Sequence, residues 1–253
     1  MTPAFLSYGT LCTQFYDADK PRAGDAEVAW YVERLPRDAG PVLEAMCGSG
    51  RLLLPLVAQQ FNVHGVDRSA AMLASCEARL ELADLKAPLY RQDVAALNLP
   101  CRYAGALVAA GSFQLITSPA DARAALERLR AHLVDPGLLL LDLFVPAEAA
   151  HPPGAPVVEV RGANLGDGAR ISLRSEVFVD AERKRIDTVS RYERRERGAI
   201  VAREDERLAM TWYDEDEIVA LVGDAGYRSV TIERSAIPAA DVDERRFAVS
   251  ARA

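Results

Sequence analysis

The stretch from residue 41 to residue 67, PVLEAMCGSGRLLLPLVAQQFNVHGVD, constrains the fold more than any other part of the chain. A short apolar run leads to Glu44, and a glycine turn, MCGSG over 46–50, follows it. The apolar residues then recur with a helical period, and a second short apolar run ends at Asp67. This order of strand, glycine turn, helix, strand and acid is typical of the first half of a nucleotide-binding βαβ unit.

The residue types in this unit suit a ligand that lies against the main chain. Gly48 and Gly50 have no Cβ, so the backbone can turn sharply and leave room for a ligand. A helix that begins near Gly50 points unpaired N–H groups at the same place. Asp67 ends the second strand, where a carboxylate can accept hydrogen bonds from both hydroxyls of a ribose.

Two common kinds of nucleotide site fit this turn poorly. A dinucleotide site requires G-x-G-x-x-G, and Leu53 stands at the third glycine position. A phosphate-binding loop requires Gly-Lys-Ser/Thr, which the turn lacks. Glu44 would repel a pyrophosphate, but it suits a ligand that carries ammonium and sulfonium charge.

On these residues the sequence resembles the class I S-adenosylmethionine (SAM)-dependent methyltransferases. Their first motif reads acid-x-Gly-x-Gly-x-Gly, and it is matched by Glu44, Gly48 and Gly50, with Met46 at the first glycine. The resemblance implies an α/β fold with a seven-stranded, doubly wound, mostly parallel sheet. It also implies SAM as the cofactor and S-adenosylhomocysteine as the product.

The resemblance further implies cofactor contacts at the strand ends, in the turns that follow them and in the N-terminal segment. These contacts fall on Tyr16, Glu44, Met46, Gly48, Gly50, Arg51, Asp67, Arg68, Met72, Gln92, Asp93, Val94, Ala110 and Gly111. Met72 would pack on the adenine, although a methionine at helical spacing also fits a plain core position. Asp93 would accept from the adenine amino group; alternatively, it caps the turn that follows it.

The apolar patterns predict the remaining elements in order. We expect a helix over 24–36, a helix over 70–82 capped by Ser69, strands over 88–91 and 105–109, a helix over 119–133, a strand over 138–144, a helix to about 225 capped by Asp214, and strands over 227–234 and 245–252. The continuous apolar run at 138–144 is typical of a strand that is buried on both faces.

The chain divides into three expected parts. Residues 40–145 and 213–253 form the SAM-binding core, and residues 1–39 form an N-terminal lid and helix. Residues 146–212 form an inserted antiparallel β meander of three or four strands that covers the acceptor site. Basic and acidic residues alternate along this insertion, so we interpret its charges as a solvated mixed-charge face and not as a nucleic-acid surface.

The lid is expected from residues 8–22, which carry aromatic and charged residues without a clean period. In small-molecule methyltransferases a segment with a Tyr-Asp pair, here Tyr16-Asp17, folds over the cofactor. The alternative is that Phe15 and Tyr16 only anchor the following helix in the core.

Length, charge and composition limit the cellular compartment and the partners that we expect. The chain has 253 residues and a net charge of −7, and no apolar run approaches the roughly 20 residues of a membrane span. Its N-terminus lacks the basic start and apolar core of a signal peptide. The four cysteines include no C-x-x-C pair, and the three histidines lie far apart. We therefore expect a cytoplasmic protein with reduced thiols, no metal, no nucleic-acid partner and no membrane contact.

The expected function is transfer of a methyl group from SAM to a small-molecule acceptor, at nitrogen or oxygen in preference to carbon. Tyr16 and Gln114 are the candidate catalytic residues; His151 and Tyr192 are further candidates for a base. We expect the acceptor between the segment of Tyr16, the turn at 112–114 and one face of the meander, in a monomer or homodimer. The alternatives are an NAD-dependent oxidoreductase, which Asp67 also suits, and a non-catalytic SAM-binding protein.

Overall fold

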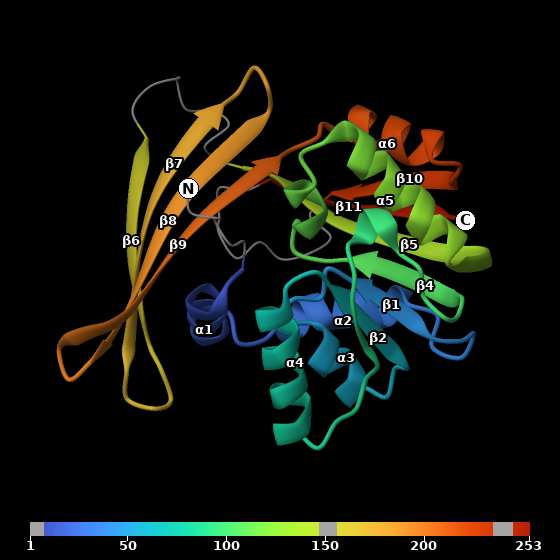
Figure 1. The fold of residues 1–253 in the computed structure, drawn as a ribbon. Coiled ribbons are helices and arrows are strands. Elements are labelled where there is room, and N and C mark those ends of the chain that lie inside the picture. Colours follow the sequence, from blue (N-terminus) through green and yellow to red (C-terminus); the bar gives the residue numbers. More distant parts are fainter. Residues whose placement is uncertain (1–7, 147–155, 235–244) are drawn as a thin grey trace.

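The computed structural model describes residues 8–146, 156–234 and 245–253, and it contains two β-sheets (Figure 1). The larger sheet has seven strands in the order β10-β11-β5-β4-β1-β2-β3. These strands are β1 Val42–Ala45, β2 Val63–Asp67, β3 Leu89–Arg91, β4 Tyr103–Val108, β5 Leu133–Val145, β10 Arg228–Arg234 and β11 Arg245–Arg252. Of the described strands in this sheet, only β11 runs antiparallel to its neighbours. The predicted seven-stranded, mostly parallel sheet is confirmed.

Helices cover both faces of this sheet (Figure 1). They are α2 Asp25–Arg34, α3 Leu53–Ala58, α4 Ala70–Leu82, α5 Pro119–Ala131 and α6 Glu215–Asp224, with two short 3₁₀ turns, η1 Val94–Ala96 and η2 Ser112–Leu115. A further helix, α1 Thr10–Asp19, packs on the second sheet. One buried cluster joins α5 and α6 to the sheet, and a second joins α2, α3 and α4 to it. Leu139 and Leu141 of β5 belong to the first cluster, whereas Leu138 and Leu140 belong to the second. Alternate side chains of one strand are therefore buried on opposite faces, as the apolar run at 138–144 predicts.

Most predicted element boundaries agree with the structure to within a few residues. The hydroxyl of Ser69 caps α4 by accepting from the Met72 N–H, and Asp214 caps α6, both as predicted. The strand predicted over 138–144 begins earlier, at Leu133, and α5 ends before it. The extension forms because Leu133 pairs with Tyr103 at the start of β4. Residues 134–136 of this extension are exposed and include Pro136, so the sequence pattern does not predict a strand there.

The predicted antiparallel insertion forms a separate four-stranded sheet in the order β6-β7-β8-β9. Its strands are β6 Val157–Asn164, β7 Arg170–Asp180, β8 Arg185–Glu196 and β9 Ala199–Thr211. Helix α1 packs on one face of it, and this small core consists of Leu11, Cys12, Phe15, Ile171, Leu173 and Tyr192. The segment expected to lack a regular period is thus helical over Thr10–Asp19, because its apolar side is buried against a distant sheet.

Two carboxylates of β9 hold the N-terminal end of α1. Glu204 accepts hydrogen bonds from the N–H groups of Leu11 and Cys12, both at 3.0 Å, and Glu206 accepts from the N–H of Tyr8 at 2.6 Å. The N–H groups of Leu11 and Cys12 are donors that a helix leaves unpaired at its start, and the helix dipole favours acids there.

The opposite side of α1 is joined to the larger sheet's helix α4. The Ser69 hydroxyl donates to the Tyr8 carbonyl at 2.7 Å, and the Ser75 hydroxyl donates to Asp17 at 2.6 Å. Helix α1 therefore bridges the two sheets. Among the described residues, no helix is both long and apolar enough to cross a membrane.

Candidate active site

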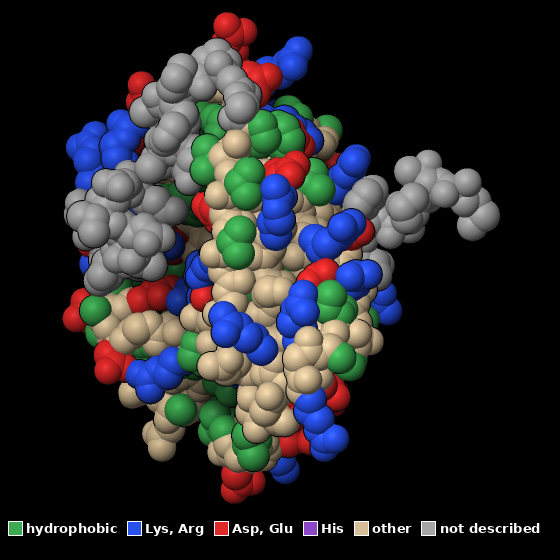
Figure 2. All heavy atoms as spheres, turned by 90° about the vertical axis from the view of Figure 1, so that its left-hand side faces the viewer, with side chains coloured by type: hydrophobic (Ala, Val, Ile, Leu, Met, Phe, Trp, Pro, Cys, Tyr) green, Lys and Arg blue, Asp and Glu red, His purple; other side chains and the backbone are tan. Residues whose placement is uncertain are grey.

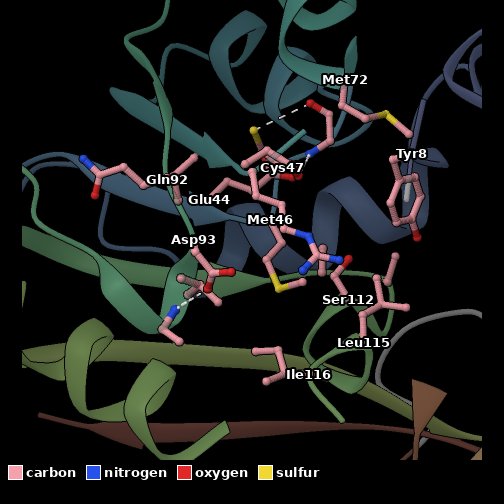
Figure 3. A pocket seen from close by; sticks show the side chains of 18 of the residues that line it. Tyr8, Glu44, Met46, Cys47, Met72, Gln92, Asp93, Ser112, Leu115 and Ile116 are labelled. Carbon is pink, nitrogen blue, oxygen red and sulfur yellow. Dashed lines mark hydrogen bonds between the residues drawn. The ribbon is translucent and has the colours of Figure 1, made fainter. Parts of the chain in front are cut away.

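A cavity of about 600 Å³ lies at the carboxyl ends of the parallel strands, where α/β sheets bind their ligands (Figure 3). It brings together most of the residues that the sequence predicts for cofactor binding. Those that line it are Tyr16, Glu44, Met46, Gly48, Arg51, Asp67, Arg68, Met72, Gln92, Asp93, Val94 and Ala110. Glu44 comes from β1, Asp67 from β2 and Ala110 from the turn after β4.

Two predicted glycines do not line the cavity, but the backbone requires both. Gly50 has φ +82°, and a Cβ there would lie 2.7 Å from the Cys76 sulfur, so its absence lets the turn pack against α4. Gly111 has φ +70°, and a Cβ there would overlap the Phe144 ring. Both glycines therefore shape the site and do not contact its contents.

Gln114 occupies a position different from the predicted one. Its side chain is buried, and its amide nitrogen donates to the carbonyls of Phe144 at 2.8 Å and Thr211 at 3.1 Å. Its amide oxygen accepts from the Phe144 N–H at 2.9 Å. The side-chain amide of Gln114 is thus hydrogen-bonded to the backbone of β5 and β9, and it does not line the cavity. We therefore withdraw the prediction that Gln114 is catalytic; it joins the two sheets.

Asp67 holds the glycine turn against the end of β2. One carboxylate oxygen accepts from the Gly48 N–H at 2.9 Å, and the other accepts from the Ser69 N–H at 2.8 Å. Burial raises the pKa of Asp67, and these two backbone donors oppose the rise. Met46, at the motif's first glycine position, has φ +60°, a left-handed conformation that costs an ordinary side chain about 1 kcal/mol.

Glu44 is a buried acid with an open acceptor. Its side chain lies in the cavity wall, the residue is 3% exposed, and its Oε2 atom has no hydrogen-bond partner among the described residues. Burial raises its pKa well above the ordinary value, and Arg51 opposes this rise. A buried carboxylate with a free oxygen is costly unless a cation or donor meets it. The position therefore fits a positively charged ligand.

Arg51 is held in place by Glu27 of α2. The two guanidinium nitrogens lie 2.7 and 2.5 Å from the two carboxylate oxygens. Burial alone would lower the pKa of Arg51, but the bonds to Glu27 outweigh it and raise the pKa. The Tyr16 hydroxyl interacts with Arg51, and burial raises the pKa of Tyr16. Tyr16 is therefore a neutral donor at neutral pH and not a ready base.

At the expected adenine end of the cavity, the lining residues also have structural roles. Met72 is 2% exposed and lies in both the core and the cavity wall. Asp93 caps η1 by accepting from the Ala95 N–H at 2.9 Å, which is the alternative we considered for it, and it also lines the cavity. The Gln92 side chain is bonded to the backbone of Asn98 at 2.8 and 3.0 Å. These contacts form the wall around η1.

Other lining residues were not expected from the sequence. Tyr8 enters from the start of α1 (Figure 3), and Cys47, Leu52, Val66, Ala95, Ala96, Ala109, Leu115, Ile116, Thr117, Ser118 and Asp121 also line the cavity. Thr117 and Ser118 lie just before α5 and Asp121 lies in its first turn, and α5 lies beside η1. No local pattern marks them, because only the fold brings this loop to the strand ends.

The expected acceptor enclosure is only partly present. Tyr16 and Ser112 line the cavity, but no described residue of the four-stranded sheet does so. Tyr192, a candidate base, lies under α1, and its hydroxyl donates to Glu206 at 3.0 Å. His151, another candidate, lies outside the described residues. In the parts of the chain that the structure describes, no group of histidine, cysteine and acidic side chains could hold a metal ion.

Comparisons with known proteins agree with this geometry. Residues 42–137 match the family described as methyltransferase domain. Over 102 residues the chain is 28% identical to a protein of Geobacillus sp. (strain WCH70) that is named as a methyltransferase. This match spans 40% of the chain and 41% of that protein's length.

Solved structures share the whole fold. A SAM-dependent methyltransferase from Clostridium acetobutylicum ATCC 824 superposes with a TM-score of 0.74 at 17% identity, covering 94% of this chain and 95% of that one. The sugar N-methyltransferase KedS8 from Streptoalloteichus sp. ATCC 53650 gives a TM-score of 0.70 at 19% identity, covering 98% and 97%.

The chain has the fold of these SAM-dependent methyltransferases, as the sequence predicts.

Proposed function

We propose that this protein transfers a methyl group from SAM to a nitrogen or oxygen atom of a small molecule. The observation that carries the proposal is Glu44, which lines the cavity at the strand ends and whose buried Oε2 has no hydrogen-bond partner among the described residues. SAM carries an ammonium group that suits this oxygen, and it has a ribose that suits Asp67. The cavity volume of about 600 Å³ is within the range of ligand pockets.

We assign the cofactor contacts from these chemistries. Asp67 accepts from the ribose hydroxyls, Glu44 from the ammonium group, and Arg51 donates to the carboxylate together with Tyr16. Met72 and Val94 pack on the adenine. When bound, SAM supplies a methyl group on a sulfonium, which leaves as part of a neutral thioether.

The chain's own contribution is positioning and shielding. An oriented pair of reactants removes much of the entropic barrier to a displacement, so no general base is needed where the acceptor has a free lone pair. The helix that carries Tyr16 is fastened on both sides, so it can exclude water from the reacting centre. Tyr16 itself stays protonated, because burial raises its pKa.

An amine is the first acceptor class to test. Asp93 and Asp121 also line the cavity and are not among the cofactor contacts assigned above, and their carboxylates favour an amine over an anion. An amine that has lost its proton also needs no base. KedS8, whose fold this chain shares, is described as a sugar N-methyltransferase, which supports an amino sugar.

Two alternative functions are an NAD-dependent oxidoreductase and a non-catalytic SAM-binding protein. An NAD-dependent oxidoreductase would need a glycine where Leu53 stands, and Leu53 is fully buried. It would also place a pyrophosphate near Glu44. A non-catalytic SAM-binding protein would use the same cavity without turnover.

The test is incubation of the purified protein with SAM and paired acceptors, amino sugars and their hydroxyl counterparts, followed by mass spectrometry. We expect one added methyl group on an amino sugar and one S-adenosylhomocysteine for each product. Methylation of only the hydroxyl counterparts would move the acceptor atom to oxygen. SAM binding without any methylated product would favour the non-catalytic alternative.

A further inference from the structure

The strand β6 is an exposed, apolar edge of the four-stranded sheet. It pairs with β7 on one side only, and no described strand lies on its other side (Figure 1). Its valines are open to solvent: Val158 is 49% exposed and Val160 is 73% exposed. A long edge strand of this kind offers a row of unpaired N–H and C=O groups to another strand.

The broad outer face of the sheet is a less suitable contact surface. Figure 2 shows basic, acidic and hydrophobic side chains interspersed on it. Its charges are already paired within the chain: Arg174 with Glu176 and Arg191 with Asp205, both at 2.7 Å. This agrees with the solvated mixed-charge face expected from the sequence, so we look to the edge and not to the face for an interface.

Charges on β6 differ from those on the outer face. Glu159 and Arg161 flank Val160 and point to the same face of the sheet, because side chains alternate along a strand. Arg161 reaches α1, where it pairs with Asp19 and lies 5.6 Å from the Phe15 ring centre. Glu159 has no ion-pair partner among the described residues. One acid on this edge is thus available to a partner.

We propose that β6 pairs antiparallel with β6 of a second copy of this chain, with Val160 on the two-fold axis. In this register Glu159 of each copy lies opposite Arg161 of the other, and the two Val160 side chains meet. Opposite charges that face each other across two strands stabilise the pairing. The two four-stranded sheets become one continuous sheet without free edges at β6.

The charges also select this register over its neighbours. Centring the pair on Glu159 would place two glutamates opposite each other, and centring it on Arg161 would place two arginines opposite each other. Like charges in that position are destabilising. A shift of the register by one residue would turn the second strand over, so that the two sheets present opposite faces on the same side. A two-fold axis perpendicular to the sheet excludes that arrangement.

The interface has a consequence for the lid. Because Arg161 contacts both Asp19 and Phe15 of α1, the second copy's Glu159 joins an existing ion pair behind the helix that carries Tyr16. The pairing itself does not depend on the proposed function, since it uses only residues of β6.

Sedimentation equilibrium of the full chain tests the proposal. We expect a dimer whose dissociation constant rises about tenfold or more in Glu159→Arg, because two attractive pairs become repulsive. Arg161→Glu should do the same, and the double variant, which exchanges the charges, should dimerise more tightly than either single variant. It should not reach the affinity of the wild type, because Arg161 also pairs with Asp19. Val160→Lys should give monomers. Val201→Lys is the matched control, because Val201 is 53% exposed on β9, away from the proposed axis.

A second measurement does not depend on affinity. Opposed Cα atoms of antiparallel strands are about 4.5–5.5 Å apart, which a disulfide can span. We expect Val160→Cys to crosslink two chains under mild oxidation, whereas Val201→Cys should not. A wild-type monomer at tens of micromolar would overturn the proposal. So would a dimer that Val160→Lys leaves intact, or a double charge exchange that dimerises no more tightly than the single variants.

Discussion

Glu27 and Arg51 form a two-contact ion pair, with nitrogen–oxygen distances of 2.7 and 2.5 Å, and Arg51 lines the cavity at the strand ends. Glu27 lies on α2 and Arg51 follows the glycine turn, so the pair joins the N-terminal helices to the cofactor motif. A buried guanidinium that is fixed on one side presents its remaining donors in one direction. In this arrangement those donors reach the cavity and the Tyr16 hydroxyl.

Glu27→Gln removes the charge of this pair while nearly keeping its volume. We expect SAM binding to weaken by roughly 1–3 kcal/mol, because Arg51 loses its charged acceptor and its fixed orientation. Calorimetry against SAM measures this change. Glu33→Gln, on the same helix but 72% exposed at its side chain, is the matched control and should bind like the wild type. Equal affinity in both variants would show that Arg51 does not need Glu27.

Asp67→Ala removes an acceptor that serves both the turn and the ribose. We expect SAM affinity to fall by roughly 1–3 kcal/mol, with a smaller loss in Asp67→Asn, whose remaining oxygen still accepts one of the two backbone N–H groups. Urea unfolding checks that both variants fold. An unchanged dissociation constant in Asp67→Ala would exclude this carboxylate from the cofactor site.

Glu204→Ala should loosen the lid helix. The variant leaves the N–H groups of Leu11 and Cys12 without their acceptor, so we expect a loss of about 0.5–2 kcal/mol in unfolding free energy and slower turnover. Asp205→Ala is the control, because Asp205 is next to Glu204 in the chain but points to the other face of the sheet, where it pairs with Arg191. If both variants turn over at the wild-type rate, α1 does not act as a lid.

Asp142 makes the stability of the fold depend on pH. It is buried on β5 and accepts from the Ala110 N–H at 2.9 Å, and burial raises its pKa to about 6. Between its ordinary pKa and about 6, the folded state keeps a proton that the unfolded state has lost, so the unfolding free energy falls as pH rises through this window.

Asp142→Asn should flatten this decline by about 1–3 kcal/mol between pH 4 and pH 6. Urea denaturation at a series of pH values measures the slope. Asp135→Asn, in the same strand but exposed, should keep the wild-type slope. A slope in Asp142→Asn as steep as that of the wild type would assign the pH dependence to other buried acids.

The strand, glycine turn and acid at the first strands could be predicted because their signals lie within one stretch of the chain. Gly48 and Gly50 share one short turn and Asp67 ends the next strand, so turn chemistry and spacing identify them. The buried strand at 138–144 was equally clear, since an apolar run needs no knowledge of its neighbours.

Other parts depend on contacts between distant segments. Helix α1 buries its apolar side against a sheet about 160 residues further along the chain. Gln114 follows a strand end, and this position led us to expect a catalytic role. Its amide instead donates hydrogen bonds to the carbonyls of Phe144 and Thr211. Neither partner could be inferred from spacing, because β5 and β9 reach Gln114 only in the folded chain.

The central claim is that Glu44 and the residues around it form a site for SAM. Titration calorimetry of the wild-type protein with SAM, S-adenosylhomocysteine and NAD tests this directly, with Glu44→Gln measured in parallel. We expect micromolar binding of SAM and S-adenosylhomocysteine, no binding of NAD, and weaker binding of both SAM compounds to Glu44→Gln. Micromolar binding of NAD with no binding of SAM would contradict the account.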